Sequence, residues 1–96
     1  MTTSSTFDPT ATNQVLTEVQ HERTRQHLKW GQQNHPAATW LAILTEEVGE
    51  LAQATLADQF GTADHHSHSS SLREEATQVA AVAVAWLEHL NRTESH

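Results

Sequence analysis

A run of nine consecutive apolar residues, Val79 to Leu87 (VAAVAVAWL), constrains the fold more than any other part of this sequence. The run follows Ser71-Leu72-Arg73-Glu74, a capping-box pattern that predicts the start of a helix. Nine successive apolar residues point in every direction around a helix axis, so this helix should be buried on more than one side. Three helices of such length cannot enclose one of their own members, so the run predicts a homo-oligomer, either a dimer or a tetramer. A partly exposed, alanine-rich face is the alternative.

The whole chain predicts an all-α fold, an antiparallel helical hairpin or bundle of three main helices that oligomerisation completes. Asp8 is the predicted N-cap of the first helix, and Pro9 its first residue. The helices are expected from Asp8-Pro9 to about Trp30, from about Pro36 (capped by Asn34 or His35) to Ala57, and from Ser71 to about Asn91. Residues 1–8 are expected to be a disordered tail, 9–91 a single domain and 92–96 a frayed tail.

The charge of the chain limits the classes of ligand that it can bind. Its formal net charge is −7 and it has five basic residues, so a nucleic-acid partner is not expected. A small polyanionic ligand would need bound cations to neutralise it. No apolar run is long enough to cross a membrane, and the chain has no cysteine, which fits a cytoplasmic protein.

The second predicted helix carries a group of carboxylates beside its apolar stripe. The stripe consists of Leu41, Leu44, Val48, Leu51 and Thr55. Glu47 falls roughly 60° from the centre of the stripe and Glu50 roughly 120°, both on the same flank, with Glu46 nearby. Like charges at i, i+3 repel unless solvent or a cation lies between them. The pair therefore predicts either a metal site or a solvated acidic flank.

The third predicted helix places another carboxylate toward the core. Glu75 lies roughly 40° from the centre of that helix's apolar stripe, with Gln78 one turn further on. A carboxylate that points toward a core needs a partner, and Arg23 or Arg25 would supply one. Alternatively, Glu47, Glu50 and Glu75 converge between two helices and hold Mg²⁺ or Mn²⁺ through their oxygens.

Three segments together resemble the MazG-like branch of the all-α nucleoside triphosphate pyrophosphohydrolases. They are ERTRQHLKWGQQNHP, EEVGELAQA and LREEATQVAAVAVAWLE, in that order, within residues 21–90. The resemblance implies Mg²⁺-dependent hydrolysis of a nucleoside triphosphate to the monophosphate and pyrophosphate, as in house-cleaning of the nucleotide pool. The family pattern is ExxE on one helix and ExxD on the next. Carried over, it implies Glu47, Glu50, Glu75 and Gln78 as metal ligands, with Gln78 in place of the family aspartate.

The resemblance also suggests roles in the reaction. Glu47 or Glu46 would help to deprotonate the attacking water, and Lys29 or Arg73 would hold the leaving pyrophosphate. Trp30 would stack on the base, and Gln32, Gln33 or His35 would read its edge, although Trp30 is equally suited to packing. Trp40 and Trp86 are assigned to core or interface packing.

Other readings of the sequence stay open. The amide of Gln78 adds no charge, so a metal-binding or nucleotide-binding module with weakened or lost activity is the main alternative. An acidic helical scaffold without a ligand is another. His65, His66 and His68 lie in a Ser-rich loop and suit a solvated loop better than a transition-metal site.

Overall fold

The computed structural model describes residues 6–61 and 71–94, which form three α-helices with no strand among them. Helix α1 spans Pro9–Trp30, α2 spans Ala37–Phe60 and α3 spans Leu72–Glu94. The predicted all-α class is therefore confirmed. His65, His66 and His68, and most of the predicted N-terminal tail, lie outside the described residues.

Local side-chain and backbone hydrogen bonds fix several of the helix ends. The Asp8 carboxylate accepts a hydrogen bond from the Thr10 N–H at 3.0 Å, as an N-cap should. Gly31 ends α1 at φ 73°, where its N–H donates to the His27 carbonyl, and a positive φ favours glycine. At α3, the Glu74 N–H donates to the Ser71 hydroxyl at 3.0 Å and the Ser71 N–H donates to the Glu74 carboxylate at 2.9 Å. The predicted capping box is thus formed in full.

Three helix ends differ from the prediction. Pro36 is the N-cap of α2 and not its first residue, and no side chain caps that end. Its carbonyl instead accepts the N–H groups of Thr39 and Trp40. Helix α2 continues past the expected end at Ala57 to Phe60, and its C-cap Gly61 is left-handed at φ 63°. Helix α3 continues past Asn91 to Glu94, within the predicted frayed tail.

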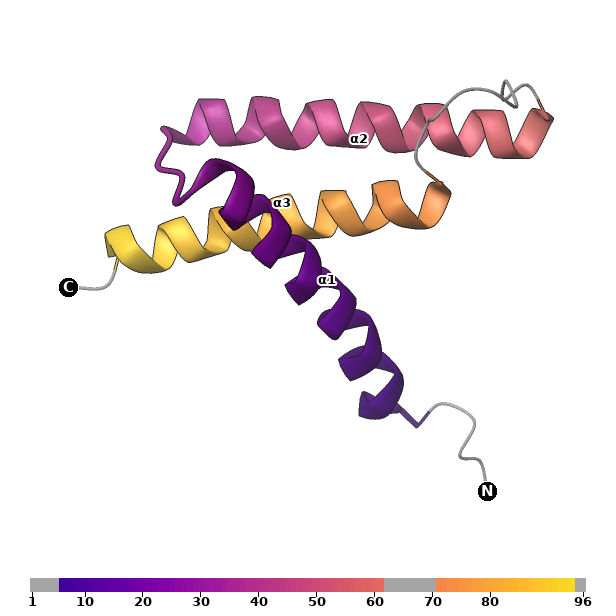
Figure 1. Ribbon diagram of the computed structural model, residues 1–96, viewed down its shortest axis with the longest axis horizontal. Coiled ribbons are helices and arrows are strands. Elements are labelled where there is room, and N and C mark those ends of the chain that lie inside the picture. Colours follow the sequence, from indigo (N-terminus) through magenta and orange to yellow (C-terminus); the bar gives the residue numbers. More distant parts are fainter. Residues whose placement is uncertain (1–5, 62–70, 95–96) are drawn as a thin grey trace.

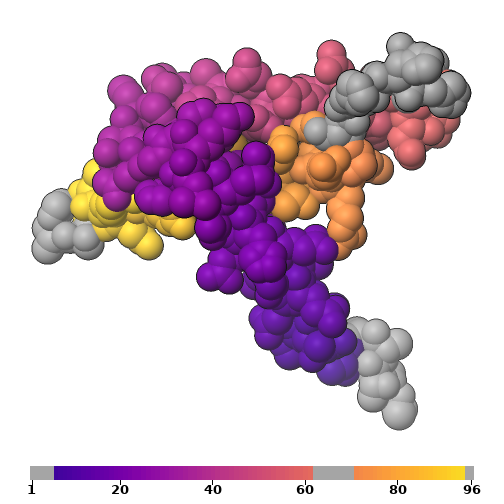
Figure 2. All heavy atoms as spheres, in the orientation of Figure 1, coloured from indigo at the N-terminus to yellow at the C-terminus, as the bar shows by residue number. Residues whose placement is uncertain are grey.

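Helix α3 is the element against which the other two helices pack. Helices α2 and α3 run side by side and antiparallel, while α1 crosses them and its N-terminal half projects away (Figure 1). The space-filling view shows the C-terminal half of α1 lying across the pair (Figure 2). Helices α1 and α2 thus both pack on α3, and among the described residues they make no close backbone contact with each other.

The core is small and centres on Trp40, which is 1% exposed. Its ring stacks on Trp86 with 6.3 Å between centroids and 8° between planes. His35 and His89 contact the same ring, at centroid distances of 4.9 and 5.7 Å. The remaining buried apolar residues among those described are Val19, Ala81 and Val82. The assignment of Trp40 and Trp86 to packing agrees with this arrangement.

The side of α2 that is buried in the structure differs in direction from the predicted apolar stripe. Its buried and half-buried residues are Trp40, Ile43, Leu44, Glu47, Leu51, Ala54 and Ala57. Leu44 and Leu51 were predicted correctly, but Leu41 and Val48 are 55% and 45% exposed. The difference is a rotation of roughly 80° about the helix axis. Because of this rotation, Glu47 lies at the centre of the buried side and not on its flank.

A single chain leaves much apolar surface uncovered. Within the run Val79–Leu87, Ala81 and Val82 are buried, Leu87 is 59% exposed and the others are half-buried. In the described residues, no helix has the length and apolar character needed to cross a membrane.

Candidate functional site

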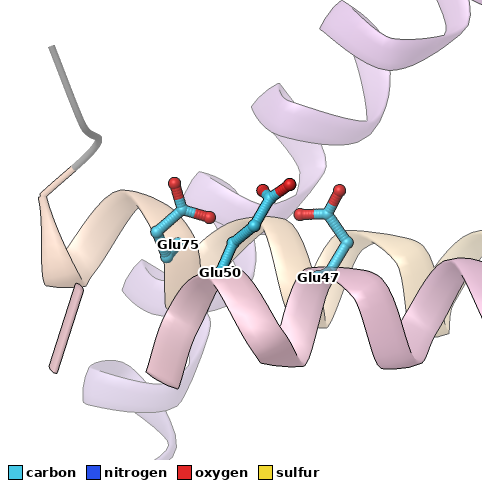
Figure 3. Close-up of side chains that lie close together, drawn as sticks. All are labelled: Glu47, Glu50 and Glu75. Atoms are coloured by element: carbon cyan, nitrogen blue, oxygen red, sulfur yellow. The ribbon is translucent and has the colours of Figure 1, made fainter. Parts of the chain in front are cut away.

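Three carboxylates from two helices meet beside the middle of the α2–α3 pair. Glu47 and Glu50 lie one turn apart on α2, and Glu75 comes from the first turn of α3. One carboxylate oxygen from each lies within 4.8 Å of the others. All three side chains point to the same side of the helix pair (Figure 3). The convergence expected from helical phase is therefore present in the structure.

Burial makes this cluster costly without a cation. Glu75 is 6% exposed, and Oε1 of Glu75 and Oε1 of Glu47 are buried without a hydrogen-bond partner among the described residues. Loss of solvation raises the pKa of Glu47, and the charges of Glu50, Glu75, Glu46 and Glu22 raise it further. Two unit charges 4.8 Å apart repel by about 1 to 3 kcal/mol, depending on whether water or protein surrounds them. The site therefore favours either a bound proton or a bound cation.

The arginines that would have neutralised Glu75 are bonded to other residues. Arg23 pairs with Glu88 at 2.6 Å and Arg25 pairs with Glu22 at 2.6 Å. Arg73 pairs with Glu18, also at 2.6 Å. None of the ion pairs of the described residues includes Glu47, Glu50 or Glu75, so the explanation of Glu75 as an arginine partner loses its support.

The residues present suit a hard divalent cation. Mg²⁺ binds carboxylate oxygens at about 2.1 Å, so its ligand oxygens are about 3 Å apart when adjacent and about 4.2 Å apart when opposite. The three oxygens lie within 4.8 Å of one another, and rotations of the side chains can bring them to these distances. The two orphaned oxygens would gain the partners that they lack. The chemistry of the donor set thus fits Mg²⁺ or Mn²⁺.

Gln78 lies one turn after Glu75 and is half-buried. Its side-chain amide is neutral, so it adds no charge beside the cluster. The neighbouring Glu74 cannot easily replace an acid at this position, because its carboxylate accepts the Ser71 N–H in the capping box. The described cluster therefore holds three formal negative charges where the ExxE–ExxD pattern would hold four.

A cavity of about 450 Å³ adjoins the acid cluster, between the C-terminal half of α1 and the α2–α3 pair. This volume is within the range of small-molecule sites. Its lining is mixed in polarity, with Glu46, Glu47 and Gln78 at the acid cluster and Trp30, Trp40, Ile43 and Val82 among the apolar groups. Arg23, Arg25, Lys29 and Arg92 contribute positive charge.

The structure brings some of the predicted substrate residues to this cavity and leaves others away from it. Lys29, Trp30 and Gln33 line it, together with Gln32. Trp30 is 54% exposed, so its ring is open to contact, and the Lys29 ammonium lies 4.8 Å from the ring centroid. His35 instead packs edge-on against Trp40, and Arg73 pairs with Glu18 away from the cavity.

Two groups of residues that the sequence analysis did not place in the site also line the cavity. One is Glu22 and Arg25 on α1, which also line a second, more open groove of about 590 Å³ together with Gln78. The other is Arg92, whose Nη2 donates to the Gln33 carbonyl at 3.0 Å and to Asn34 at 3.1 Å. The i, i+3 spacing of Glu22 and Arg25 signals an ion pair, but only the crossing of α1 over α3 shows that it faces the acids.

Comparison with known proteins gives no further assignment. No protein-family model matches the chain, and no curated protein and no solved structure match it either.

Proposed function

We propose that this protein is a Mg²⁺-dependent or Mn²⁺-dependent pyrophosphohydrolase that converts a nucleoside triphosphate to the monophosphate and pyrophosphate. The observation that carries the proposal is the cluster of Glu47, Glu50 and Glu75, with two buried oxygens that lack partners. The adjoining cavity supplies aromatic, amide and cationic groups suited to a nucleotide. The resemblance to the MazG-like pyrophosphohydrolases supports the choice of reaction.

The proposed reaction assigns a role in metal binding, proton transfer or substrate binding to each side chain of the site. Glu47, Glu50 and Glu75 hold the cation, with the Gln78 amide oxygen as a neutral ligand. A cation bound there would neutralise phosphate charge and lower the pKa of a bound water. Glu46 lines the cavity next to Glu47, and one of these two carboxylates would accept a proton from the water that attacks the α-phosphorus. Lys29 offsets the charge of the phosphates, while Trp30 and Gln33 contact the base.

Incubation with a panel of nucleoside and deoxynucleoside triphosphates and Mg²⁺ tests the reaction. We expect release of pyrophosphate with the matching monophosphate, and loss of turnover on addition of a chelator. Release of orthophosphate from the γ position, or no turnover of any nucleotide, would contradict the proposal.

The alternative is a metal-binding and nucleotide-binding module that has lost turnover, and the neutral Gln78 favours it. Gln78→Asp separates the two. If the parent protein turns over nucleotides, the hydrolase assignment stands. If turnover arises only in Gln78→Asp, the parent is a binding module. A scaffold without a ligand would show no effect of Mg²⁺ on its melting temperature, whereas a native-state site must raise it.

We also propose that the protein is a homo-oligomer and acts in the cytoplasm, where nucleoside triphosphates and Mg²⁺ are abundant. Leu41 and Val48 on α2 and Leu72 and Leu87 on α3 are exposed, on the sides of their helices opposite the residues that line the cavity. A second copy covering this face would bury the apolar run of α3 and leave the cavity open.

A further inference from the structure

We propose that Arg25, held by Glu22, binds the pyrophosphate portion of the substrate at the junction between the cavity and the open groove. This inference rests on the proposed function, because it assigns one part of the same nucleotide site. It names a phosphate-binding residue on α1, outside the two helices that supply the acids.

The position of Arg25 is the first observation. Glu22, Arg25 and Gln78 are the residues that line both the cavity and the groove. A substrate whose base lies near Trp30 and whose α-phosphate lies at the acid cluster has its remaining phosphates next to Gln78. The groove connects this position to solvent, and Arg25 is one of the residues that line the groove.

The second observation is how Arg25 is held. Its Nε donates to Oε1 of Glu22 at 3.0 Å and its Nη2 donates to Oε2 at 2.6 Å. The Glu22 side chain is 13% exposed and also accepts from the Gln26 amide at 3.4 Å, so the carboxylate is well fixed. The Arg25 side chain is 54% exposed, and its Nη1 has no hydrogen-bond partner among the described residues. The guanidinium is therefore oriented on one side and has donors left for a ligand.

The other cations of the cavity are less suited to this task. Arg23 uses Nε and Nη2 on Glu88, at 3.2 and 2.6 Å, and Nη1 on Gln26 at 3.5 Å. Arg92 holds the turn before α2 through Gln33 and Asn34. Lys29 lies over the Trp30 ring, one turn after Arg25 along α1. None of these three lines the groove.

The reduced negative charge of the acid cluster explains why a positive side chain is needed near the phosphates. With Gln78 neutral, the site attracts a second cation less strongly than four carboxylates would. A guanidinium keeps its positive charge at all relevant pH values and binds phosphate oxygens in a bidentate manner. Arg25 can thus provide, within the chain, part of the charge that a second ion would supply.

The test compares Arg25→Gln with Gln14→Glu. Gln14 is exposed on the projecting half of α1, and its change to glutamate lowers the net charge by the same single unit. Binding of pyrophosphate, a non-hydrolysable α,β-imido deoxynucleoside triphosphate and a deoxynucleoside monophosphate is measured by calorimetry with Mg²⁺ present. Binding of Mn²⁺ alone is measured by electron paramagnetic resonance. Circular dichroism checks the fold, which the loss of one partly exposed i, i+3 pair should leave intact.

We expect Arg25→Gln to weaken binding of pyrophosphate and of the triphosphate analogue by about tenfold to a hundredfold, the usual effect of a lost charge-assisted hydrogen bond. Binding of the monophosphate and of Mn²⁺ should stay within about twofold, a difference of only ~0.4 kcal/mol. Arg25→Lys should restore less than half of the lost affinity in logarithmic terms, because an ammonium cannot bond to Glu22 and to phosphate in the same fork geometry.

Unchanged pyrophosphate affinity in Arg25→Gln would overturn the inference. Equal losses for Gln14→Glu would overturn it too, because net charge alone would then explain the effect. Equal losses of affinity for the monophosphate and for pyrophosphate would show that Arg25 does not act on the pyrophosphate portion of the substrate. If the parent binds Mn²⁺ and pyrophosphate as described but turns over no nucleotide, the proposed reaction fails while the assignment of Arg25 stands.

Discussion

At the scale of single residues, Glu75 shows why the acid cluster is a functional candidate. A solvated acidic flank would keep its carboxylates in water, but Glu75 is 6% exposed and one of its oxygens lacks a partner. A protein retains such a group against its desolvation cost only if something offsets that cost, since a same-sized neutral side chain would be easier to bury.

The first prediction follows from that cost. Glu75→Gln should stabilise the metal-free protein by about 1 kcal/mol, because it removes a buried charge next to Glu47 and Glu50. It should also abolish most of the rise in melting temperature caused by Mg²⁺. Thermal unfolding with and without Mg²⁺ measures both effects. The control is Asp58→Asn, an exposed acid of α2 outside the cluster, for which neither effect is expected.

The pKa of Glu47 leads to a second prediction. Burial and the neighbouring acids raise this pKa in the folded protein above its value in the unfolded chain. The folded state therefore binds the proton more tightly, and the resulting stabilisation is complete below the unfolded pKa and is lost as pH rises through the folded pKa. Without metal, the parent should gain stability relative to Glu47→Gln as pH falls through this range.

Mg²⁺ should act in the opposite direction, because it binds the deprotonated carboxylate. The difference in melting temperature with and without Mg²⁺ should be larger at pH 7.5 than at pH 5. Thermal unfolding with and without Mg²⁺ at the two pH values measures this difference, and urea unfolding of the parent and Glu47→Gln across the same range measures the metal-free effect. A Mg²⁺ effect that grows as pH falls would count against a carboxylate site.

At the scale of helices, the sequence predicted the features that depend on local residues better than those that depend on tertiary packing. The N-cap Asp8, the glycine end at Gly31 and the capping box at Ser71 were predicted correctly, because each depends on residues within four positions. The direction in which α2 turns its buried side was partly wrong. Leu44 and Leu51 belong to two neighbouring apolar stripes of α2, and the packing of Trp40 on Trp86 of α3 selects between them.

The same distinction applies to the site. The meeting of Glu47, Glu50 and Glu75 follows from the phases of two adjacent antiparallel helices, so the sequence predicted it. The positions of Glu22 and Arg25 depend on the angle at which α1 crosses α3. Neither residue type nor spacing contains that angle, and so the sequence analysis did not include these residues in the site.

The capping box gives the third prediction. Ser71→Ala should lower the free energy of unfolding by about 1 kcal/mol, since it leaves the Glu74 N–H without its side-chain acceptor. Urea unfolding measures the loss. Thr77→Ala is a suitable control, because its hydroxyl donates to a helical carbonyl already bonded within α3 and contributes little. Equal losses in the two variants would show that the cap has no special role.

At the scale of the whole molecule, the exposed apolar face of the α2–α3 pair predicts the fourth outcome. Leu41→Asp should shift the protein toward the monomer by at least tenfold in dissociation constant, because it places a charge in the proposed contact between copies. Size-exclusion chromatography with light scattering, at several protein concentrations, measures the oligomeric state. Gln53→Glu adds the same charge to another exposed side of α2 and should leave the assembly unchanged. A monomeric parent at micromolar concentration would contradict the proposal.

The projecting half of α1 has a consequence for the motions of the molecule. Between Pro9 and Thr17 its residues are exposed, apart from the half-buried Thr12, and the first buried anchor is Val19. A helical segment this short is marginal without packing, so its backbone amides should exchange with deuterium well before those of α3. The chain thus joins a labile arm to a firmly packed pair of helices. A molecule that binds the N-terminal half of α1 would also reduce the mobility of the part of α1 that carries Glu22 and Arg25.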